Sequence, residues 1–270
     1  MQMGKIIGII ALKGGVGKTS CTANLGAALA MQYNKKVLII DTNFNAANLG
    51  FHVGLFEPKT TIHDVLLGKA EITDAIYEYQ PNLHIIPAAV TPLLIRNPYK
   101  LKQKIASLKK HYDVILLDSS PSLNNEILST MIASDELYVV ASPDYPTLST
   151  TLRAVSIAKA KKVPIKGIIL NKVRGKKFEL STADVEETAQ VPVIGVIPDD
   201  VKMLEALAYT KAIHEHAPRT NAAIELNKIA GSIIGENYED PRLWKRFLEK
   251  FKGKNDARGF LTPEGVKRNP

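Results

Sequence analysis

The sequence contains very little cysteine and no long apolar run, and each shortage excludes a class of protein. Cys21 is the only cysteine among 270 residues, so no disulfide can form within the chain, which fits a reducing cytoplasm. We expect Cys21 to pack on the buried face of a helix. No apolar run approaches the ~18 residues of a membrane-spanning helix, and an apolar strand begins so early that we expect no signal peptide.

The rest of the composition is that of a globular protein with a basic end. Hydrophobic residues make up 45% and charged residues 23% of the chain, which predicts a soluble protein with a sizeable core. The formal net charge is +8. Between Pro241 and Pro270 nine Lys or Arg residues stand against three Asp or Glu, so this stretch carries +6 and the other 240 residues carry +2. We therefore expect a basic partner-binding surface at the C-terminal end.

A glycine-rich segment near the start has the form of a phosphate-binding loop: Lys13, Gly14, Gly15, Val16, Gly17, Lys18, Thr19 and Ser20. It stands between an apolar run over residues 6–12 and a helical pattern over residues 18–33, the strand–turn–helix context that such a loop needs. Glycines let successive backbone N–H groups turn toward an anion, and the helix N-terminus adds partial positive charge. We expect Lys18 to reach the β- and γ-phosphates of a nucleotide and the Thr19 hydroxyl to bind Mg²⁺.

Strand-like and helix-like stretches alternate along the chain. The predicted strands cover residues 6–12, 36–41, 82–88, 112–118, 136–141, 165–170 and 193–197. The predicted helices cover residues 18–33, 62–67, 101–111, 148–161, 181–188, 201–208 and 220–234. This alternation predicts the α/β class, with a mostly parallel twisted β-sheet flanked by helices.

Two of the predicted strands end in an aspartate, Asp41 and Asp118, and a third leads into the glycine-rich loop. Ligands of an open parallel sheet bind beyond the carboxyl ends of its strands. These strand ends therefore predict a single Mg²⁺-nucleotide site, with P-loop NTPase architecture.

The glycine-rich loop departs from the common pattern G-x-x-x-x-G-K-[ST], because Leu12 stands at the first glycine and Lys13 follows it. A lysine at this place resembles the deviant Walker A loop of the ParA/MinD family of P-loop ATPases. The likeness runs from about residue 5 to residue 234 and is greatest to the MinD-type ATPases that place the division septum or the flagella. It implies that Lys13 reaches the nucleotide of the partner subunit in an ATP-dependent homodimer.

The resemblance also implies roles for the two strand-end aspartates and for Asn43. Asp118 resembles the Walker B aspartate, and Asp41 the aspartate that supports the hydration shell of Mg²⁺, so that Thr19, Asp41 and Asp118 form the expected metal site. Asn43 stands where the family often has a second aspartate, which positions the attacking water. An asparagine can hydrogen-bond that water but cannot accept its proton, so we expect slow hydrolysis of ATP to ADP.

Two further groups of residues follow from the same resemblance. The segment after Asp118 resembles a switch that senses the γ-phosphate, and Asn48 matches an asparagine of the other switch loop; the expected switch residues are Asn48, Ser119, Ser120 and Pro121. Residues at the ends of two later strands are expected to bind the adenine of ATP or ADP: Asn171, Pro198 and Asp199.

The composition changes at residues 235–241, which predicts a division of the chain. We expect a P-loop ATPase domain over residues 1–235, a basic amphipathic helix within residues 236–252 and a disordered tail over residues 253–270. One stripe of that helix is apolar and is made of Leu243, Trp244, Phe247, Leu248 and Phe251. Such a helix can lie in a membrane interface, where each basic residue near an anionic surface adds ~1 kcal/mol. It can equally pack its stripe on the domain.

Three functions remain open on the sequence alone. The first is a cytoplasmic positioning ATPase, peripheral at the inner face of the cell membrane, that works with an activating or cargo protein. The second is a partition ATPase of the ParA type that binds DNA non-specifically, which the Pro121-Ser122-Leu123 segment favours. The third is a nucleotide-dependent scaffold that hardly hydrolyses ATP, which Asn43 favours.

Overall fold

The computed structural model of the chain describes residues 3–91 and 93–242. The chain divides into two compact units, Met1–Asn237 and Tyr238–Pro270, and the sheet with its helices belongs to the first. The predicted membrane stripe of Leu243, Trp244, Phe247, Leu248 and Phe251 lies outside the described residues, so the role of that stripe stays a prediction.

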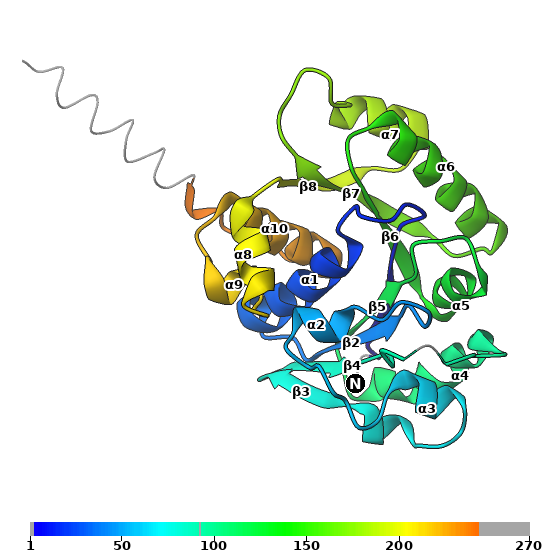
Figure 1. Ribbon diagram of the computed structural model, residues 1–270. Coiled ribbons are helices and arrows are strands. Elements are labelled where there is room, and N and C mark those ends of the chain that lie inside the picture. The colour runs from blue at the N-terminus through cyan, green and yellow to red at the C-terminus, as the bar shows by residue number, and fades with distance from the viewer. Residues whose placement is uncertain (1–2, 92, 243–270) are drawn as a thin grey trace, which may run out of the picture. The chain divides into compact units, whose positions relative to one another are not determined.

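An eight-stranded sheet forms the centre of the first unit, in the order β3-β4-β2-β5-β1-β6-β7-β8 (Figure 1). The strands are β1 (Lys5–Ile10), β2 (Val37–Thr42), β3 (Tyr77–Gln80), β4 (Leu83–Ile86), β5 (Val114–Ser119), β6 (Glu136–Ala141), β7 (Ile165–Val173) and β8 (Val193–Pro198). Every pairing is parallel except that of β3 with β4. The predicted α/β class with a mostly parallel sheet is confirmed.

The helices surround this sheet on both faces (Figure 1). They are α1 (Lys18–Tyr33), α2 (Leu49–His52), α3 (Ile62–Leu66), α4 (Leu101–Ile105), α5 (Asn125–Ala133), α6 (Tyr145–Ala160), α7 (Thr182–Ala189), α8 (Val201–Ala208), α9 (Ile213–His216) and α10 (Asn221–Ile234). Short 3₁₀ segments add η1 (Ile72–Ala75), η2 (Pro98–Lys100) and η3 (Ala106–Lys110). None of the helices in the described part of the chain is long and apolar enough to cross a membrane.

Several elements differ from the sequence prediction, and helices α2, α5 and α9 were not predicted at all. The single helix predicted over residues 101–111 is wrong, because the α-helix ends at Ile105 and η3 continues as a tighter 3₁₀ turn. The Lys109 carbonyl there accepts the Gly4 N–H at 2.8 Å, so the last turn is bound to the start of β1 instead of continuing the helix. Edge strand β3 was not predicted, since its four residues carry no apolar run and only one side of it is paired.

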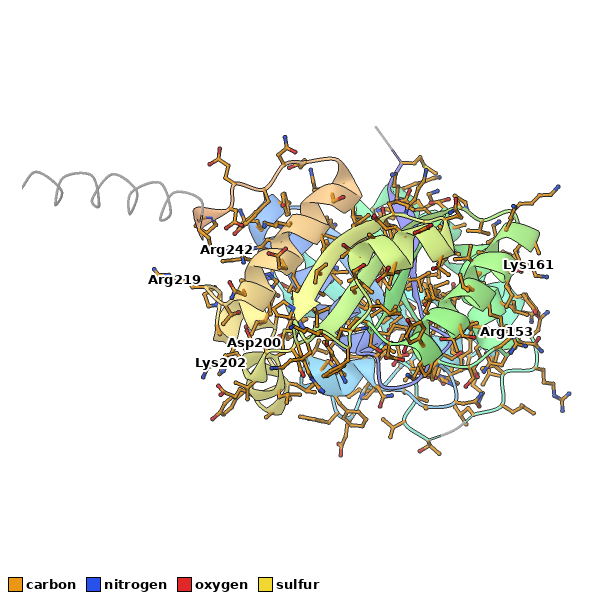
Figure 2. All side chains as sticks on the ribbon, turned by 90° about the horizontal axis from the view of Figure 1, so that it is seen from above. Arg153, Lys161, Asp200, Lys202, Arg219 and Arg242 are labelled. Carbon is orange, nitrogen blue, oxygen red and sulfur yellow. The ribbon has the colours of Figure 1, made fainter. Side chains whose placement is uncertain are left out.

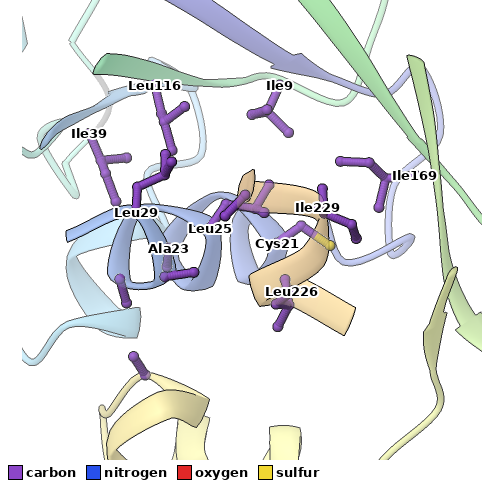
Figure 3. Close-up of a cluster of buried hydrophobic side chains, with 14 of the residues drawn as sticks. Ile9, Cys21, Ala23, Leu25, Leu29, Ile39, Leu116, Ile169, Leu226 and Ile229 are labelled. Atoms are coloured by element: carbon purple, nitrogen blue, oxygen red, sulfur yellow. The ribbon is translucent and has the colours of Figure 1, made fainter. Parts of the chain in front are cut away.

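Helix α1 is the most buried helix of the site and fixes the glycine-rich loop in front of it. In Figure 3 its side chains Cys21, Leu25 and Leu29 lie among the sheet residues Ile9, Ile39, Leu116 and Ile169 and the α10 residues Leu226 and Ile229. Cys21 is fully buried, as predicted, and this burial raises the pKa of its thiol to about 12. Helix α1 is therefore packed between the sheet and α10.

The opposite face of the sheet carries two further cores. One joins β2 and β5 to α3, α4 and η3, and the other joins β6 and β7 to α5, α6 and α7. Because α5 and α6 each follow a central strand, their N-termini are placed at the carboxyl edge of the sheet, beside the glycine-rich loop.

Candidate functional site

The glycine-rich loop connects β1 to α1 with an open outer side. Gly15 and Gly17 have φ angles of 78° and 85°, which favour glycine strongly. A Cβ added to Gly14 or Gly15 would meet nothing within 4 Å, whereas one on Gly17 would come within 2.3 Å of the Asn171 amide nitrogen. The loop is thus closed behind Gly17 and open toward the solvent in front, which fits a cradle for an anion of the size of a phosphate group.

Lys18 and Asp118 form a buried ion pair behind this loop. The Lys18 Nζ lies 2.6 Å from Asp118 Oδ1, and the two side chains are 6% and 1% exposed. The Thr22 hydroxyl, one turn further along α1, also donates to Asp118 Oδ1, at 3.2 Å. Asp118 Oδ2 is buried without a hydrogen-bond partner among the described residues, so the carboxylate keeps an open oxygen for a cation.

Asp41 lies beside Asp118 in the sheet register and organises the next loop. Its Oδ1 accepts the N–H of Asn43 at 3.0 Å, and its Oδ2 accepts the N–H groups of Asn48 and Leu49 at 3.1 Å each. Burial and the charge of Asp118 raise the pKa of Asp41 to about 7. Two buried carboxylates side by side are a strong attraction for a hard divalent cation, so this donor set fits Mg²⁺.

Residues 43–48, called the switch I loop because they contain the predicted switch residue Asn48, form a compact turn. The side-chain amides of Asn43 and Asn48 both donate to the Ala46 carbonyl. Asn43 is 5% exposed, and its N–H is bound to Asp41. The amide of Asn43 therefore closes the loop in this structure, and it brings no negative charge to it.

Residues 119–124, called the switch II segment because they contain the predicted switch residues Ser119, Ser120 and Pro121, lead from β5 to α5. The Ser119 hydroxyl donates to the Ser120 carbonyl at 3.1 Å, and the Ser120 hydroxyl to Asn124 Oδ1 at 3.0 Å. Asn124 caps α5 by accepting two backbone N–H groups of its first turn. Pro121 lies half-buried between them, so all the predicted residues of this switch lie at the carboxyl edge.

Lys13 points away from its own loop to the N-terminus of α6. Its Nζ lies 3.0 Å from Asp144 Oδ1 and 2.9 Å from the Thr147 hydroxyl. Partial burial opposes ionisation of Asp144, but hydrogen bonds from Ser142, Thr147 and Lys13 lower its pKa to about 2. Asp144 was not predicted as a site residue, although Asp144-Tyr145-Pro146 has the form of a helix N-terminus.

The predicted adenine residues lie at the ends of β7 and β8. The buried Asn171 amide donates to the Val16 carbonyl at 2.8 Å, and Lys172 Nζ donates to the Gly15 carbonyl at 2.7 Å. Asp199, which follows Pro198, forms an exposed ion pair with Arg174 at 2.7 Å. The structure thus brings Asn171 against the glycine-rich loop, while Pro198 and Asp199 lie at the end of the edge strand.

Charged side chains outside this edge extend outward from the flanking helices. In Figure 2, Arg153 and Lys161 lie at one flank of the molecule, on or just after α6. Asp200 and Lys202, at the start of α8, lie at the other flank. The ion pairs that join the glycine-rich loop to later elements of the chain are those of Lys18 and Lys13.

Fold and site together are those of a P-loop nucleotide-binding protein. A family model described as an AAA domain matches residues 4–163. The chain is 35% identical over 249 residues to an ATP-binding protein of Methanocaldococcus jannaschii, covering 91% of this chain and 94% of that one.

Solved structures of MinD proteins are similar over most of the chain. The cell division ATPase MinD of Pyrococcus furiosus has a TM-score of 0.82 and 34% identity, covering 86% of this chain and 99% of that one. The septum site-determining protein MinD of Pyrococcus horikoshii, complexed with Mg-ADP, has a TM-score of 0.81 and 33% identity, covering 86% of this chain and 96% of that one. The chain belongs to the ParA/MinD family of P-loop ATPases.

Proposed function

We propose that the protein is an ATP-binding and slowly ATP-hydrolysing spatial-positioning switch. With ATP bound it forms a homodimer, and the dimer associates with an anionic membrane surface and with an activating or cargo protein. The observation that carries this proposal is the position of Lys13, which belongs to the phosphate-binding loop and yet turns its ammonium group away from it.

The contact of Lys13 is one that a stronger anion can replace. The side chains of Lys13 and Asp144 are 38% and 40% exposed, and ion pairs of this exposure contribute about 1 kcal/mol or less. The polyphosphate of a nucleotide held by a second subunit carries several negative charges. Asp144 therefore binds the Lys13 side chain within its own subunit when no partner is present. When a second subunit with bound ATP approaches, the Lys13 ammonium group exchanges Asp144 for the phosphates of that ATP.

The nucleotide itself fits the residues behind the loop. We assign the backbone N–H groups of residues 14–20 and the Lys18 ammonium to the phosphates, and Asn171, Pro198 and Asp199 to the adenine. Thr19, Asp41 and Asp118 would hold Mg²⁺, which supplies charge stabilisation at the phosphate oxygens. With nucleotide bound, Lys18 would exchange Asp118 for the phosphates, and the unpartnered Oδ2 of Asp118 would be available to hold the cation. The Asn43 amide orients water without accepting its proton, which makes hydrolysis slow.

Sedimentation velocity with ATP and with ADP tests the dimer. We expect wild type to dimerise with ATP only, and Lys13→Ala to stay monomeric while it still binds ATP. Asp144→Asn should dimerise at lower protein concentration, because Lys13 loses its competing anion. Lys172→Ala is the matched control, since this exposed lysine contacts the same loop at Gly15. Dimerisation of Lys13→Ala equal to that of wild type contradicts the proposed role.

Co-sedimentation with anionic vesicles, with ATP and with ADP, tests the membrane. We expect ATP-dependent binding by the full chain, and its loss both in a Trp244→Glu/Phe247→Glu variant and in a chain that ends at Glu239. Binding to DNA in place of vesicles, steeply weakened by salt, would instead favour the partition ATPase to which Pro121-Ser122-Leu123 is similar. If the protein binds neither vesicles nor DNA and shows no single-turnover hydrolysis, the result would favour the nucleotide-dependent scaffold.

A further inference from the structure

Glu126, a carboxylate outside the predicted site, reaches the switch I loop from another element. It is the second residue of α5, directly after the switch II segment, and it is 7% exposed. Its Oε1 accepts a hydrogen bond from the side-chain amide of Asn45, at the tip of the switch I loop. Glu126 therefore bridges the loop after β2 and the helix after β5.

The first two turns of α5 contact the end of β2 and the switch II segment. The Thr130 hydroxyl lies 2.8 Å from the Thr42 hydroxyl at the end of β2. Asn124, the N-cap of α5, accepts the Ser120 hydroxyl of the switch II segment and the N–H of Glu126. Asn124 and Glu126 thus connect the switch II segment to the tip of the switch I loop through the first turn of α5.

Glu126 differs from an ordinary acidic residue in the first turn of a helix. Asp184, in the first turn of α7, is exposed, and hydrogen bonds from Ser181 lower its pKa, as expected of a capping acid. At Glu126 burial raises the pKa, although N–H groups of Asn45, Phe44 and Asn124 oppose the rise. Burial of this kind destabilises the carboxylate in the present conformation.

The free-energy cost of burying the Glu126 carboxylate falls mainly on one of its oxygens. Glu126 Oε2 is buried and has no hydrogen-bond partner among the described residues. A side chain selected only to cap α5 gains nothing from a buried oxygen without a partner. A buried carboxylate oxygen without a partner, beside two loops, is available to a donor that a movement of either loop would bring to it.

We propose that Glu126 is a positioning residue for ATP hydrolysis, which supplies to the switch I loop the negative charge that Asn43 lacks. It holds the loop tip through Asn45, so that the Asn43 amide stands where it orients the attacking water, and it passes the state of the switch II segment to that loop. This inference rests on the proposed ATPase function and names a residue that the family resemblance did not supply.

Single-turnover hydrolysis and ATP affinity, measured on the full chain, test this role. We expect Glu126→Gln to lower the hydrolysis rate constant by about 10- to 100-fold, because the substitution keeps the acceptor for Asn45 but removes the negative charge that we assign to the positioning of the attacking water. The dissociation constant for ATP should change by less than about threefold, since no contact of Glu126 lies in the glycine-rich loop. The melting temperature should not fall, because the buried oxygen without a partner loses its charge. Asp184→Asn, a first-turn acid far from the switches in sequence, is the control and should hydrolyse ATP like wild type.

Placing an aspartate at position 43 distinguishes a role of Glu126 in positioning the attacking water from a role in stabilising the fold. In the double variant Asn43→Asp/Glu126→Gln we expect hydrolysis to recover by at least about tenfold over Glu126→Gln, a coupling that independent sites do not show. Unchanged hydrolysis in Glu126→Gln overturns the proposal, as does a loss that follows a lower melting temperature and is not recovered by Asn43→Asp. A wild-type protein that binds ATP and does not hydrolyse it at all removes the ATPase function itself, which is a different result.

Discussion

The phosphate side of the proposed site, around Lys18 and Asp118, and its base side, around Arg174 and Asp199, share one edge of the sheet but are built differently. On the phosphate side the side chains of Lys18 and Asp118 are 6% and 1% exposed and 2.6 Å apart. On the base side the ion pair of Arg174 and Asp199 has a similar length, 2.7 Å, with side chains 61% and 36% exposed. Two ion pairs of similar length thus differ in their exposure to solvent. Solvent screening determines how much each pair contributes to the free energy of folding.

The comparison shows that the charges whose loss would cost most are the buried ones on the phosphate side. A buried pair is costly to separate, because either partner left alone is an uncompensated charge in a region of low polarity. Lys18 can leave Asp118 only when another anion and another cation take the two places. We therefore expect substitutions in the buried pair to change stability and nucleotide affinity more than substitutions in the exposed pair.

Removing Lys18 should give the largest effect. In Lys18→Met the carboxylate of Asp118 stays buried beside Asp41 without its cation, and we expect the free energy of unfolding to fall by about 3–5 kcal/mol at neutral pH. ATP affinity should be lost as well. Chemical denaturation and titration with a fluorescent ATP analogue measure both.

A second variant shows whether the stability loss comes from the isolated charge. Lys18→Met/Asp118→Asn should recover most of the unfolding free energy and none of the ATP affinity. If the double variant is as unstable as the single one, the buried pair is not the reason, and the comparison between the two sides fails.

The second largest effect should be the pH dependence of stability, which we expect to arise from Asp41 on the phosphate side. Folding raises the pKa of Asp41 from 3.8 to about 7, so its contribution to stability is complete below pH 3.8 and is lost as the pH rises through about 7. The difference between the two pKa values corresponds to at most about 4 kcal/mol in protein without nucleotide.

Mg²⁺ with ADP should oppose that loss, because the cation binds the ionised carboxylate. The rise in melting temperature on adding Mg-ADP should be greater at about pH 8 than at about pH 5. In Asp41→Asn the difference between the two pH values should shrink. An equal rise at both pH values in wild type would mean that Asp41 is ionised throughout.

The sequence predicted the positions of these charges but not their pairing. Apolar runs that end in Asp41 and Asp118 are visible in the sequence, because a buried parallel strand has to be apolar to its end. The pairs Lys18–Asp118 and Lys13–Asp144 join residues 100 and 131 positions apart, and only the strand order of the folded sheet determines them. The same holds for Glu126, whose place in α5 was not predicted as helical at all.

Asn171 lies between the two sides, and its substitution should have an intermediate effect. Its amide joins the end of β7 to the Val16 carbonyl, so Asn171→Ala should lower the free energy of unfolding by about 1 kcal/mol. We expect ATP affinity to fall by about tenfold, together with the preference for ATP over GTP. Competition titrations with the two nucleotides measure this. A change in stability with unaltered nucleotide preference would restrict Asn171 to a structural contact.

Arg174 should show the smallest effect, and it is the direct counterpart of Lys18. Water already screens its pair with Asp199, so Arg174→Ala should leave the melting temperature unchanged and the ATP dissociation constant within about twofold of wild type. Thermal melting with and without ATP, at low and at moderate salt, makes the measurement, and Lys176→Ala on the same exposed loop is the control. A large loss of affinity in Arg174→Ala alone would mean that nucleotide binding buries this pair, and the base side would then have to be described as a surface that closes over its ligand.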